Sequence, residues 1–570
     1  MRKRLSLFVV VLLVIAIVTS CNAGTVTTGS TTAGTTGTTA TGGSTTAAPS
    51  SNMTGKGELP IVKEKVTYKI MAPQTSYILD LNTNDYTVWL EEQTNVHMEY
   101  ELVPENAMRE KVSLTLASQV LPDAFMSCGI SPADQVLYGT QGVFVPQNKF
   151  FDDYGVEILK AYDANAVLPE AITAPDGNIY AIAGINECYH CFYSGRAWIN
   201  QKWLDNLGLK YPTTTDELYT VLKAFKTQDA NGNGDPDDEI PMMGADNGWQ
   251  TRVYEYLLQS FIYNDYGDRL AVTNGKIEFT ATSPAFKEGL KYIKKLLDEG
   301  LIDPVSLTQT QEQAVVVARD PENITVGVAI GALWWSLMGE DVADPLKRSR
   351  EYVGLSPVKG PDGNRYALTA EGGVVTGQWV ITNVAKNPEV LFRWGDFQFG
   401  DMPTLYSSWG PKEGVGRKVP PEGTLGINGK PALYEVIVWT DTANIQNYHM
   451  TNIAIANRTS DFRLGQAVPD DPETKWDVEV RLQAETRDNF APYRSDMALP
   501  ALMMDADSSA KRATLGTPIR DYALESIVAF LAGNLDLEAD WDTYVKEYEA
   551  LKLEEYLQLL QTAYDAQYGK

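Results

Sequence analysis

Oxygen-bearing side chains are concentrated between residues 229 and 239, in the sequence DANGNGDPDDE. Asp229, Asn231 and Asn233 alternate along the chain, and Gly234 follows them. Side chains at the first, third and fifth positions of a tight loop converge on one point, and their oxygens suit Ca²⁺. The glycine allows the sharp turn that this convergence requires. The spacing therefore predicts a calcium site. Its candidate ligands are Asp229, Asn231, Asn233, Asp235, Asp237, Asp238 and Glu239.

This loop departs from the standard twelve-residue calcium loop. Its first six positions match the pattern D-x-[DN]-x-[DN]-G, but the twelfth position is Ile240, and Glu239 comes one place too early. The alternative interpretation is a solvated acidic loop that binds no metal. We interpret the loop as a structural calcium site that ties down one loop of the fold, and the sequence leaves open whether Asp237 or Asp238 is the ligand.

Tryptophans form the second group of residues that could do chemistry, and the chain has 12 of them. A sugar presents apolar C–H faces that stack on aromatic rings, and its hydroxyls need planar donors and acceptors. Trp249, Trp335, Trp409 and Trp439 lie in polar or loop-like stretches, so they are the candidates for such stacking. Arg196 is a candidate polar contact to the same ligand, although it could equally belong to a structural ion pair.

Four other tryptophans are expected in the core, because they fall on amphipathic helices. They are Trp89, Trp203, Trp394 and Trp541.

Cys188 and Cys191 flank His190 in a C-x-x-C arrangement. Such a motif can be half of a zinc site or a redox pair, but the chain has no second C-x-x-C and only three histidines. A local disulfide or two unpaired thiols is the favoured interpretation, and Cys128 is an alternative partner.

The stretch around the acidic loop resembles a known family. The sequence W-I-N-x-x-W-L-D-x-L-G-L begins at Trp198, and P-T-T-x-D-E, L-K-A-F-K and the loop itself follow in order. G-L-I-D-P at 300–304 and the aromatic C-terminal run at 530–565 agree with it. This chain resembles the extracellular solute-binding lipoproteins of oligosaccharide ABC importers (family 1 type), and is most similar to the large Gram-positive lipoproteins and the alginate-binding proteins.

The resemblance implies an α/β fold with two lobes, of the periplasmic-binding-protein (Venus flytrap) type, with a hinge and an interlobe cleft. It implies capture of an oligosaccharide in that cleft and delivery to the transmembrane permease subunits of an ABC transporter. We also expect a monomer with structural Ca²⁺, on the extracellular face of the cell membrane. The family loop that faces ligand resembles residues 407–414 of this chain.

The N-terminal residues predict export and anchoring. Arg2, Lys3 and Arg4 precede a short apolar run that ends in small residues before Cys21, which is typical of a secretory signal. The cysteine at that point resembles a lipobox, which implies a lipid on Cys21 and attachment to the membrane. The run is too short to span a bilayer comfortably.

Residues 24–51 are almost wholly Thr, Gly, Ser and Ala, so they cannot bury enough surface to fold and should form a flexible tether. The expected organisation is a signal peptide (1–20), a lipidated cysteine and tether (21–58) and a two-lobe body (59–570). The N-lobe is expected over 59–185 plus a later return segment. The C-lobe is expected over 186–450 with the C-terminal helices.

The body begins with an alternation of strands and helices. Strands are expected at 66–71, 96–102 and 121–126, and helices at 86–93 and 108–118. This order predicts βαβ units and a parallel sheet. Ligands bind outside the carboxyl ends of the strands in such sheets, so the turn after Met126 should face a cleft.

The later elements follow from the same periodicities. Helices are expected at 242–266, 285–298 and 388–399, and a capping box at Thr214–Glu217 should start another helix. Residues 324–333 form an apolar run that predicts a buried strand, with Trp335 just beyond it.

The charge and the motifs bound the function. A net charge of −27 argues against nucleic acid and anionic lipid surfaces. The sequence contains neither H-E-x-x-H nor G-x-S-x-G, so no enzyme is indicated. A surface glycosidase or lyase needs only a positioned carboxylate pair, and it remains the alternative, together with an adhesin or sensory subunit on the same scaffold.

Overall fold

The computed structural model describes residues 51–75, 77–164, 168–339, 344–369, 373–437, 445–468, 470 and 477–569. The leader, Cys21, nearly all of the predicted tether and Trp439 lie outside the described residues. Among the helices that are described, none is long and apolar enough to cross a membrane.

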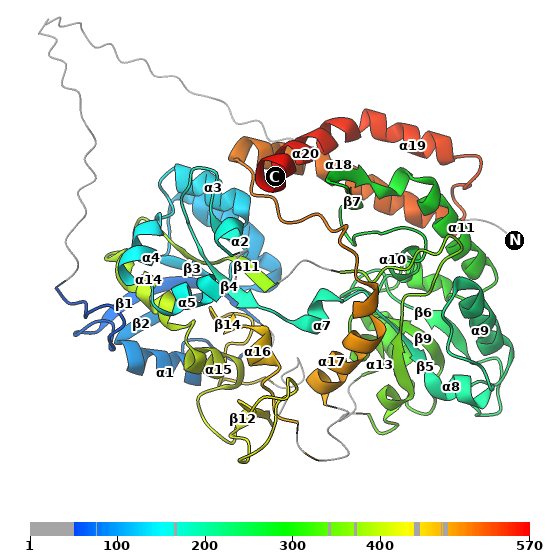
Figure 1. The fold of residues 1–570 in the computed structure, drawn as a ribbon, viewed down its shortest axis with the longest axis horizontal. Helices are drawn as coiled ribbons and strands as arrows, with labels where there is room; N and C mark the ends of the chain where they lie inside the picture. Colours follow the sequence, from blue (N-terminus) through cyan, green and yellow to red (C-terminus); the bar gives the residue numbers. More distant parts are fainter. Residues whose placement is uncertain are drawn as a thin grey trace, which may run out of the picture. The chain divides into compact units, whose positions relative to one another are not determined.

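A six-stranded sheet, here called the first sheet, has the strand order β14-β4-β11-β3-β1-β2 (Figure 1). Only β11 runs antiparallel to its neighbours. The other five strands therefore end at one edge, which we call the carboxyl edge of the first sheet. The strands are β1 (Val66–Gln74), β2 (Val96–Pro104), β3 (Ala124–Met126), β4 (Ile182–Asn186), β11 (Gly373–Ile381) and β14 (Asn457–Arg458).

Successive residues of the central strands enter two different cores, because side chains alternate between the faces of a sheet. Ile70, Met126 and Trp379 belong to one core, and Met71 and Phe125 to the other. Helices therefore cover both faces. They are α1 (Asp85–Thr94), α2 (Met108–Ser118), α3 (Pro132–Thr140), α4 (Asn148–Tyr154), α5 (Glu157–Ala164), α6 (Leu168–Ile172), α14 (Pro388–Phe397), α15 (Asp401–Trp409) and α16 (Ser460–Arg463).

The predicted βαβαβ order from residue 66 to 126 is confirmed, and its strands pair in parallel.

Local signals explain the boundaries of α1. The Asn84 side chain accepts a hydrogen bond from the Tyr86 N–H at the start, and Asn95 ends the helix in the left-handed conformation with φ 57°. Asparagine suits both positions, because its short amide caps a helix and tolerates positive φ.

A second sheet has the strand order β10-β5-β9-β6, with only β6 and β9 parallel to each other. Its strands are β5 (Ala197–Asn200), β6 (Ile240–Met243), β9 (Val326–Ile330) and β10 (Tyr352–Leu355). The buried strand predicted at 324–333 is β9, and all five of its residues are buried. The helices of this part are α8 (Gln201–Asn206), α9 (Thr215–Thr227), α10 (Val253–Leu258), α11 (Pro284–Asp298), α12 (Gln311–Ala318), α13 (Trp335–Met338) and α17 (Val478–Asn489).

Three C-terminal helices share the main core of the second sheet, and Figure 1 shows them next to α11. They are α18 (Ala506–Ala532), α19 (Trp541–Ala550) and α20 (Leu553–Tyr568). Trp203 and Trp541 are buried in this core, and Trp394 in the core of the first sheet, as predicted. Trp89 packs partly buried against the latter core.

The chain passes between the two sheets three times. It leaves the first sheet after β4 through the short helix α7 (Tyr189–Phe192), returns from β10 to β11, and leaves again between α16 and α17. Strand β11 and the helices α14 and α15, which belong with the first sheet, fall within the range 186–450. Two small hairpins complete the fold, β7 (Leu270–Thr273) with β8 (Lys276–Phe279), and β12 (Arg417–Lys418) with β13 (Glu435–Val436).

The helix predicted over 242–266 is wrong. Met242 and Met243 end strand β6, and a loop follows until α10 starts at Val253. The loop requires glycine, because a Cβ on Gly244 would lie 2.2 Å from the Thr251 carbonyl oxygen. The apolar residues of this stretch are buried in a strand and in a short helix, and they do not form the apolar face of one continuous helix.

The predicted tether extends too far toward the body. Residues 51–58 fold against the first sheet, where the guanidinium of the buried Arg393 donates to the carbonyl oxygens of Thr54, Gly55 and Glu58 at 2.7–2.8 Å. The Thr54 N–H also donates to the Ile61 carbonyl oxygen at 3.0 Å. These contacts place the start of the folded body at or before residue 51.

Candidate functional site

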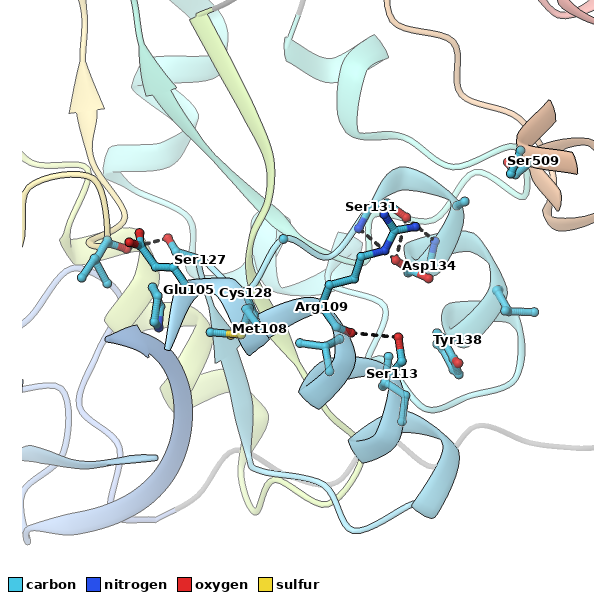
Figure 2. A pocket seen from close by; sticks show the side chains of 18 of the residues that line it. Glu105, Met108, Arg109, Ser113, Ser127, Cys128, Ser131, Asp134, Tyr138 and Ser509 are labelled. Atoms are coloured by element: carbon cyan, nitrogen blue, oxygen red, sulfur yellow. Dashed lines mark hydrogen bonds between the residues drawn. The ribbon is translucent and has the colours of Figure 1, made fainter. Parts of the chain in front are cut away.

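A cavity of about 930 Å³ opens at the carboxyl edge of the first sheet, where the sequence predicted a cleft after Met126. We call it the first-sheet cavity. Figure 2 shows the turn after β3, the helix α2, the start of α3 and part of α18 around it. Its polar lining consists of Thr75, Tyr77, Glu105, Arg109, Ser113, Ser127, Ser131, Asp134, Tyr138, Asn452, Asp507 and Ser509.

The turn after β3 forms the floor of this cavity and is held from two sides. Ser127 adopts a left-handed conformation with φ 54°. Its N–H donates to the Gln378 carbonyl oxygen and its hydroxyl to the Ile453 carbonyl oxygen, both at 2.7 Å. The Cys128 thiol donates to the Met71 carbonyl oxygen at 3.2 Å, and burial raises the pKa of this thiol to about 12. Cys128 is therefore a neutral packing residue.

Two polar side chains of the cavity already form hydrogen bonds that begin helix α3. Ser131 and Asp134 form a reciprocal capping box, in which each side chain accepts from the backbone N–H of the other. Asp134 is thus used to cap the helix. Glu105 in the turn before α2 and Arg109 at the start of α2 supply a carboxylate and a cation to the same cavity. Hydroxyls, a carboxylate and a cation together complement a ligand that both donates and accepts hydrogen bonds.

Two of the predicted tryptophans lie just beyond the parallel strands of the second sheet. Trp249 follows β6 and is 45% exposed, and its carbonyl oxygen accepts from the Ala332 N–H at 3.1 Å. Trp335 follows β9 and packs edge-on against Trp334, with ring centroids 5.0 Å apart. The structure thus brings both residues to the carboxyl edge of the β6–β9 pair. Neither lines the first-sheet cavity.

The other predicted ligand contacts are placed differently. Trp409 is the last residue of α15 and only 8% exposed, with its ring packed on Tyr434. The loop over 407–414, expected to face ligand, thus begins inside α15, which contains residues 407–409. Trp439 lies outside the described residues.

Arg196 is fully buried, so the structure corrects its expected role from ligand contact to internal cation. Its guanidinium donates to the carbonyl oxygens of Ala332 and His190 and to the Thr486 hydroxyl. Burial lowers its pKa to about 9, which keeps it protonated at neutral pH.

The acidic loop between α9 and β6 is held by hydrogen bonds among its own residues. The Asp229 carboxylate accepts from the N–H groups of Gly232 and Gly234 at 2.8 and 3.0 Å. Asp238 accepts from the side-chain amides of Asn231 and Asn233 at 3.0 and 2.7 Å. Asn231 and Asn233 therefore turn their amide N–H groups toward Asp238, while their amide oxygens accept from the N–H groups of Asn233 and Asp235 at 2.9 and 2.7 Å.

Glu239 gives the independent sign that the loop suits a cation. One of its carboxylate oxygens accepts from the Ala230 N–H at 2.7 Å, whereas Oε2 is buried without a hydrogen-bond partner among the described residues. Burial raises the pKa of Glu239, and Asp238 adds to this effect. A buried, unpaired oxygen beside a second carboxylate is costly unless a cation joins them. Asp237 and Asp235 lie on the exposed side of the loop.

Cys188, His190 and Cys191 lie close together, but the two cysteines form a local disulfide and His190 only neighbours it. Cys188 and Cys191 are bonded, and the His190 Nε2 lies 3.3 Å from the Cys188 sulfur. Sulfur atoms bonded to each other are not thiolate ligands, so the disulfide interpretation is confirmed.

Two α/β sheets joined by three crossings, with binding groups at their carboxyl edges, define the class of protein. The chain is a two-lobe solute-binding protein of the kind that serves oligosaccharide ABC importers. No family model matches the chain. It is similar to the fructooligosaccharide ABC transporter substrate-binding protein FusA of Streptococcus pneumoniae, with 28% identity over 525 residues, which are 88% of this chain and 91% of FusA.

Structures agree with the sequence comparison. FusA in complex with kestose matches with a TM-score of 0.73 and 27% identity over 89% of this chain and all of that one. Another FusA structure is an EF-hand mutant in complex with fructo-nystose. An HMO binding ABC-transporter associated solute-binding protein from Bifidobacterium longum infantis shares the fold, with a TM-score of 0.73 and 20% identity over 88% of this chain and 99% of its own.

A second sequence relative is lipoprotein LipO of Bacillus subtilis, 27% identical over 319 residues, which are 55% of this chain and 60% of LipO. The relatives similar over most of the chain are substrate-binding proteins and not enzymes. This favours the transport interpretation over the glycosidase or lyase alternative.

Sequence reasoning missed the residues that line the first-sheet cavity, because it searched for tryptophan. Tyr77 and Asn452 both line this cavity. The rule that ligands bind beyond the carboxyl ends of parallel strands could have found Tyr77, which follows β1. Asn452 carried no comparable signal, since β14 is only two residues long.

Proposed function

We propose that this chain captures a neutral oligosaccharide outside the cell and delivers it to the permease of an ABC importer. The observation that carries the proposal is the first-sheet cavity, which offers hydroxyls, a carboxylate and a cation together. A sugar hydroxyl donates and accepts hydrogen bonds, so it can use both kinds of group. Trp249 and Trp335 do not line this cavity, and they would supply a separate stacking surface for sugar rings at the carboxyl edge of the β6–β9 pair.

Fructose-containing oligosaccharides are the ligand class to test first. The relative that matches over most of the chain is a fructooligosaccharide-binding protein, and it was crystallised with kestose. The strongly negative net charge supports a neutral ligand over a polyanionic one, because like charges repel.

The proposed location is the outer face of the cell membrane. The lipobox-like cysteine, Cys21, would carry the lipid, and the Thr- and Gly-rich stretch after it would act as the tether. LipO, a lipoprotein, is a sequence relative. We expect the body to be monomeric and to contact only the permease subunits and its ligand.

Calcium binding by the acidic loop is part of the proposal. Asp229, Asn231, Asn233, Asp238 and Glu239 would hold the ion, because Asp238 lies against both asparagine amides and Glu239 has a buried oxygen without a partner among the described residues. The existence of an EF-hand mutant of FusA supports this assignment. The ion would bind and orient the loop between α9 and β6, and it has no part in ligand chemistry.

The experiment that tests the function is a thermal-shift screen of the body from Ser51 onward against kestose, nystose, inulin fragments, maltotriose, cellotriose and digalacturonate. A ligand that binds only the folded state raises the melting temperature. Positive glycans are then titrated by isothermal calorimetry, and the mixture is analysed by chromatography. Stabilisation with the glycan intact supports the proposal. Consumption of the glycan would replace it with the enzyme alternative.

A further inference from the structure

Three polar side chains from distant parts of the chain meet at one wall of the first-sheet cavity. Tyr77 follows β1, Asn452 precedes β14, and Arg458 is the last residue of β14. Tyr77 and Asn452 line the cavity, whereas Arg458 is buried next to Asn452. The parallel pairing of β14 with β4 is what brings Arg458 to the carboxyl edge.

The backbone at Asn452 is shaped to present a small polar side chain. Asn452 has φ 69°, in the left-handed region, and its side chain is exposed while Ile453 beside it is buried. Asparagine is the residue other than glycine that adopts this conformation most readily. The position therefore holds an amide at the wall of the cavity and contributes little packing.

Arg458 determines which way this amide points. Its Nη1 donates to the Asn452 Oδ1 at 3.2 Å. A guanidinium has only donors, so the amide oxygen must face Arg458 and the amide NH₂ must face away from it. Burial and the nearby Arg463 lower the pKa of Arg458 to about 10, so it is still a cation and a donor at neutral pH.

Tyr77 is held by its hydroxyl at the same place. The hydroxyl donates to the Thr451 carbonyl oxygen at 3.3 Å, and the Asn452 side chain is a second hydrogen-bond partner. The ring is half-buried and lines the cavity. A ring that is fixed before the ligand arrives loses less entropy on binding, which makes it an effective surface for stacking.

We infer that Tyr77 and Asn452 form one sugar-ring subsite in the first-sheet cavity. The Tyr77 ring stacks on the apolar face of the sugar, and the remaining N–H of the Asn452 amide donates to a sugar hydroxyl. Arg458 is a positioning residue that acts through Asn452. This inference rests on the proposed function, because it names residues of the same site.

The test is calorimetric titration of the wild-type body and its variants with kestose. If kestose does not bind, the panel glycan that stabilises the wild-type protein most takes its place. Tyr77→Leu and Asn452→Gly should each weaken binding about tenfold, the usual effect of losing one well-made contact. Glycine accepts φ 69°, so Asn452→Gly should keep its melting temperature.

Matched controls exclude a general effect on the fold. Tyr219→Leu removes a half-buried tyrosine whose hydroxyl is bonded to Glu299, and Asn274→Gly replaces a left-handed asparagine with φ 53° in the β7–β8 turn. Neither residue lines the cavity, and both control variants should bind within twofold of the wild-type protein.

The role of Arg458 is tested by a double-variant comparison. Arg458→Met alone should weaken binding severalfold, and Arg458→Lys should restore part of the loss, since lysine can still donate to Asn452. In the Asn452→Gly background, Arg458→Met should cause no further loss, because the residue through which it acts is gone. A merely structural effect would multiply the two losses, and that result would overturn the positioning role.

The remaining outcomes separate this inference from the proposed function. If the wild-type protein binds a glycan and Tyr77→Leu and Asn452→Gly bind it equally well, the subsite is wrong and the proposed function stands. If the wild-type protein binds no glycan of the panel, the proposed function fails and the subsite fails with it.

Discussion

Asp237 and Asp238 are neighbours in the chain, yet the loop uses them differently. Asp238 accepts from Asn231 and Asn233, whereas only the backbone N–H of Asp237 takes part, donating to Asp235 at 3.2 Å. We therefore expect Asp238→Asn to weaken calcium binding at least tenfold, measured by calorimetry with CaCl₂ on chelator-stripped protein. Asp237→Asn is the matched control, with the same loss of charge, and should stay within about threefold. Equal losses in the two variants would show that only net charge matters.

Single residues were predictable where local spacing decides their role. The alternation of Asp229, Asn231 and Asn233 marks a convergent loop in any fold that contains it. The role of Trp409 depends on a contact with Tyr434 that forms only when the chain folds back. Its polar neighbours in sequence therefore predicted exposure that packing removes.

Helices α7, α16 and α17 share a buried charged cluster at a crossing between the sheets. Glu479 of α17 lies 3.1 Å from the Arg463 guanidinium of α16 and 3.3 Å from the His190 Nδ1 of α7. Burial alone would raise the pKa of Glu479, but His190 and Arg463 lower it to about 2. A depressed carboxyl pKa gives stability that is present above the unfolded value and lost as the pH falls through the folded value.

The prediction for this cluster is acid sensitivity. Between about pH 4.5 and pH 2 the protein should lose the stability that ionised Glu479 contributes, because its pKa in the folded state is lowered to about 2. Burial lowers the pKa of His190, so its protonation acts in the same direction. Urea unfolding at several pH values measures the slope. Glu479→Gln should be less stable at pH 7 and show a flatter slope, and an unchanged slope would contradict the assignment.

The segment before β1 is expected to be part of the folded body. Removing residues 51–58 would leave the buried Arg393 guanidinium without three of its carbonyl acceptors. We expect the free energy of unfolding of a body that starts at Leu59 to be lower than that of a body that starts at Ser51. The difference should be about 1–3 kcal/mol per unsatisfied group, and urea unfolding measures it. Arg393→Met should destabilise the longer body much more than the shorter one, and an equal effect in both would disprove the contact.

Elements were predictable when one periodicity governs them from end to end. Strand β1 and helix α2 were located to within a few residues, because alternation and the helical repeat are local. The stretch 242–266 failed because an apolar strand and a short apolar helix flank a polar, glycine-dependent loop there. Burial without a single period gives no basis for choosing between helix and sheet.

Calcium should stabilise the whole molecule and not only its loop, since α9 and β6 on either side belong to the second sheet and its core. At a calcium concentration a hundred times Kd, the gain is about 2.7 kcal/mol. Addition of EDTA to metal-replete protein should therefore lower the melting temperature by a few degrees. Scanning calorimetry measures this change. Asp238→Asn should already melt lower and show no further response to EDTA. An EDTA response equal to that of the wild-type protein would contradict the site.

The architecture as a whole was predictable only in part. A parallel sheet at the start and a cleft at its carboxyl edge follow from physical rules, whereas the crossings came from the resemblance to a family. The cavity wall shows the reason. Tyr77 and Asn452 meet only because β14 pairs beside β4, and no periodic pattern records a contact between such distant residues.

The three crossings also set an order in which the molecule can be completed. The four strands of the second sheet all lie between residues 197 and 355, so this sheet can close from one continuous stretch of chain. The first sheet needs β11 and β14, which are synthesised after every strand of the second sheet. Contacts between residues that are far apart in sequence form slowly, because a long loop must first be closed. The sheet that begins first is therefore the sheet that closes last, and the cavity wall with Tyr77 and Asn452 exists only once residue 458 has joined that sheet.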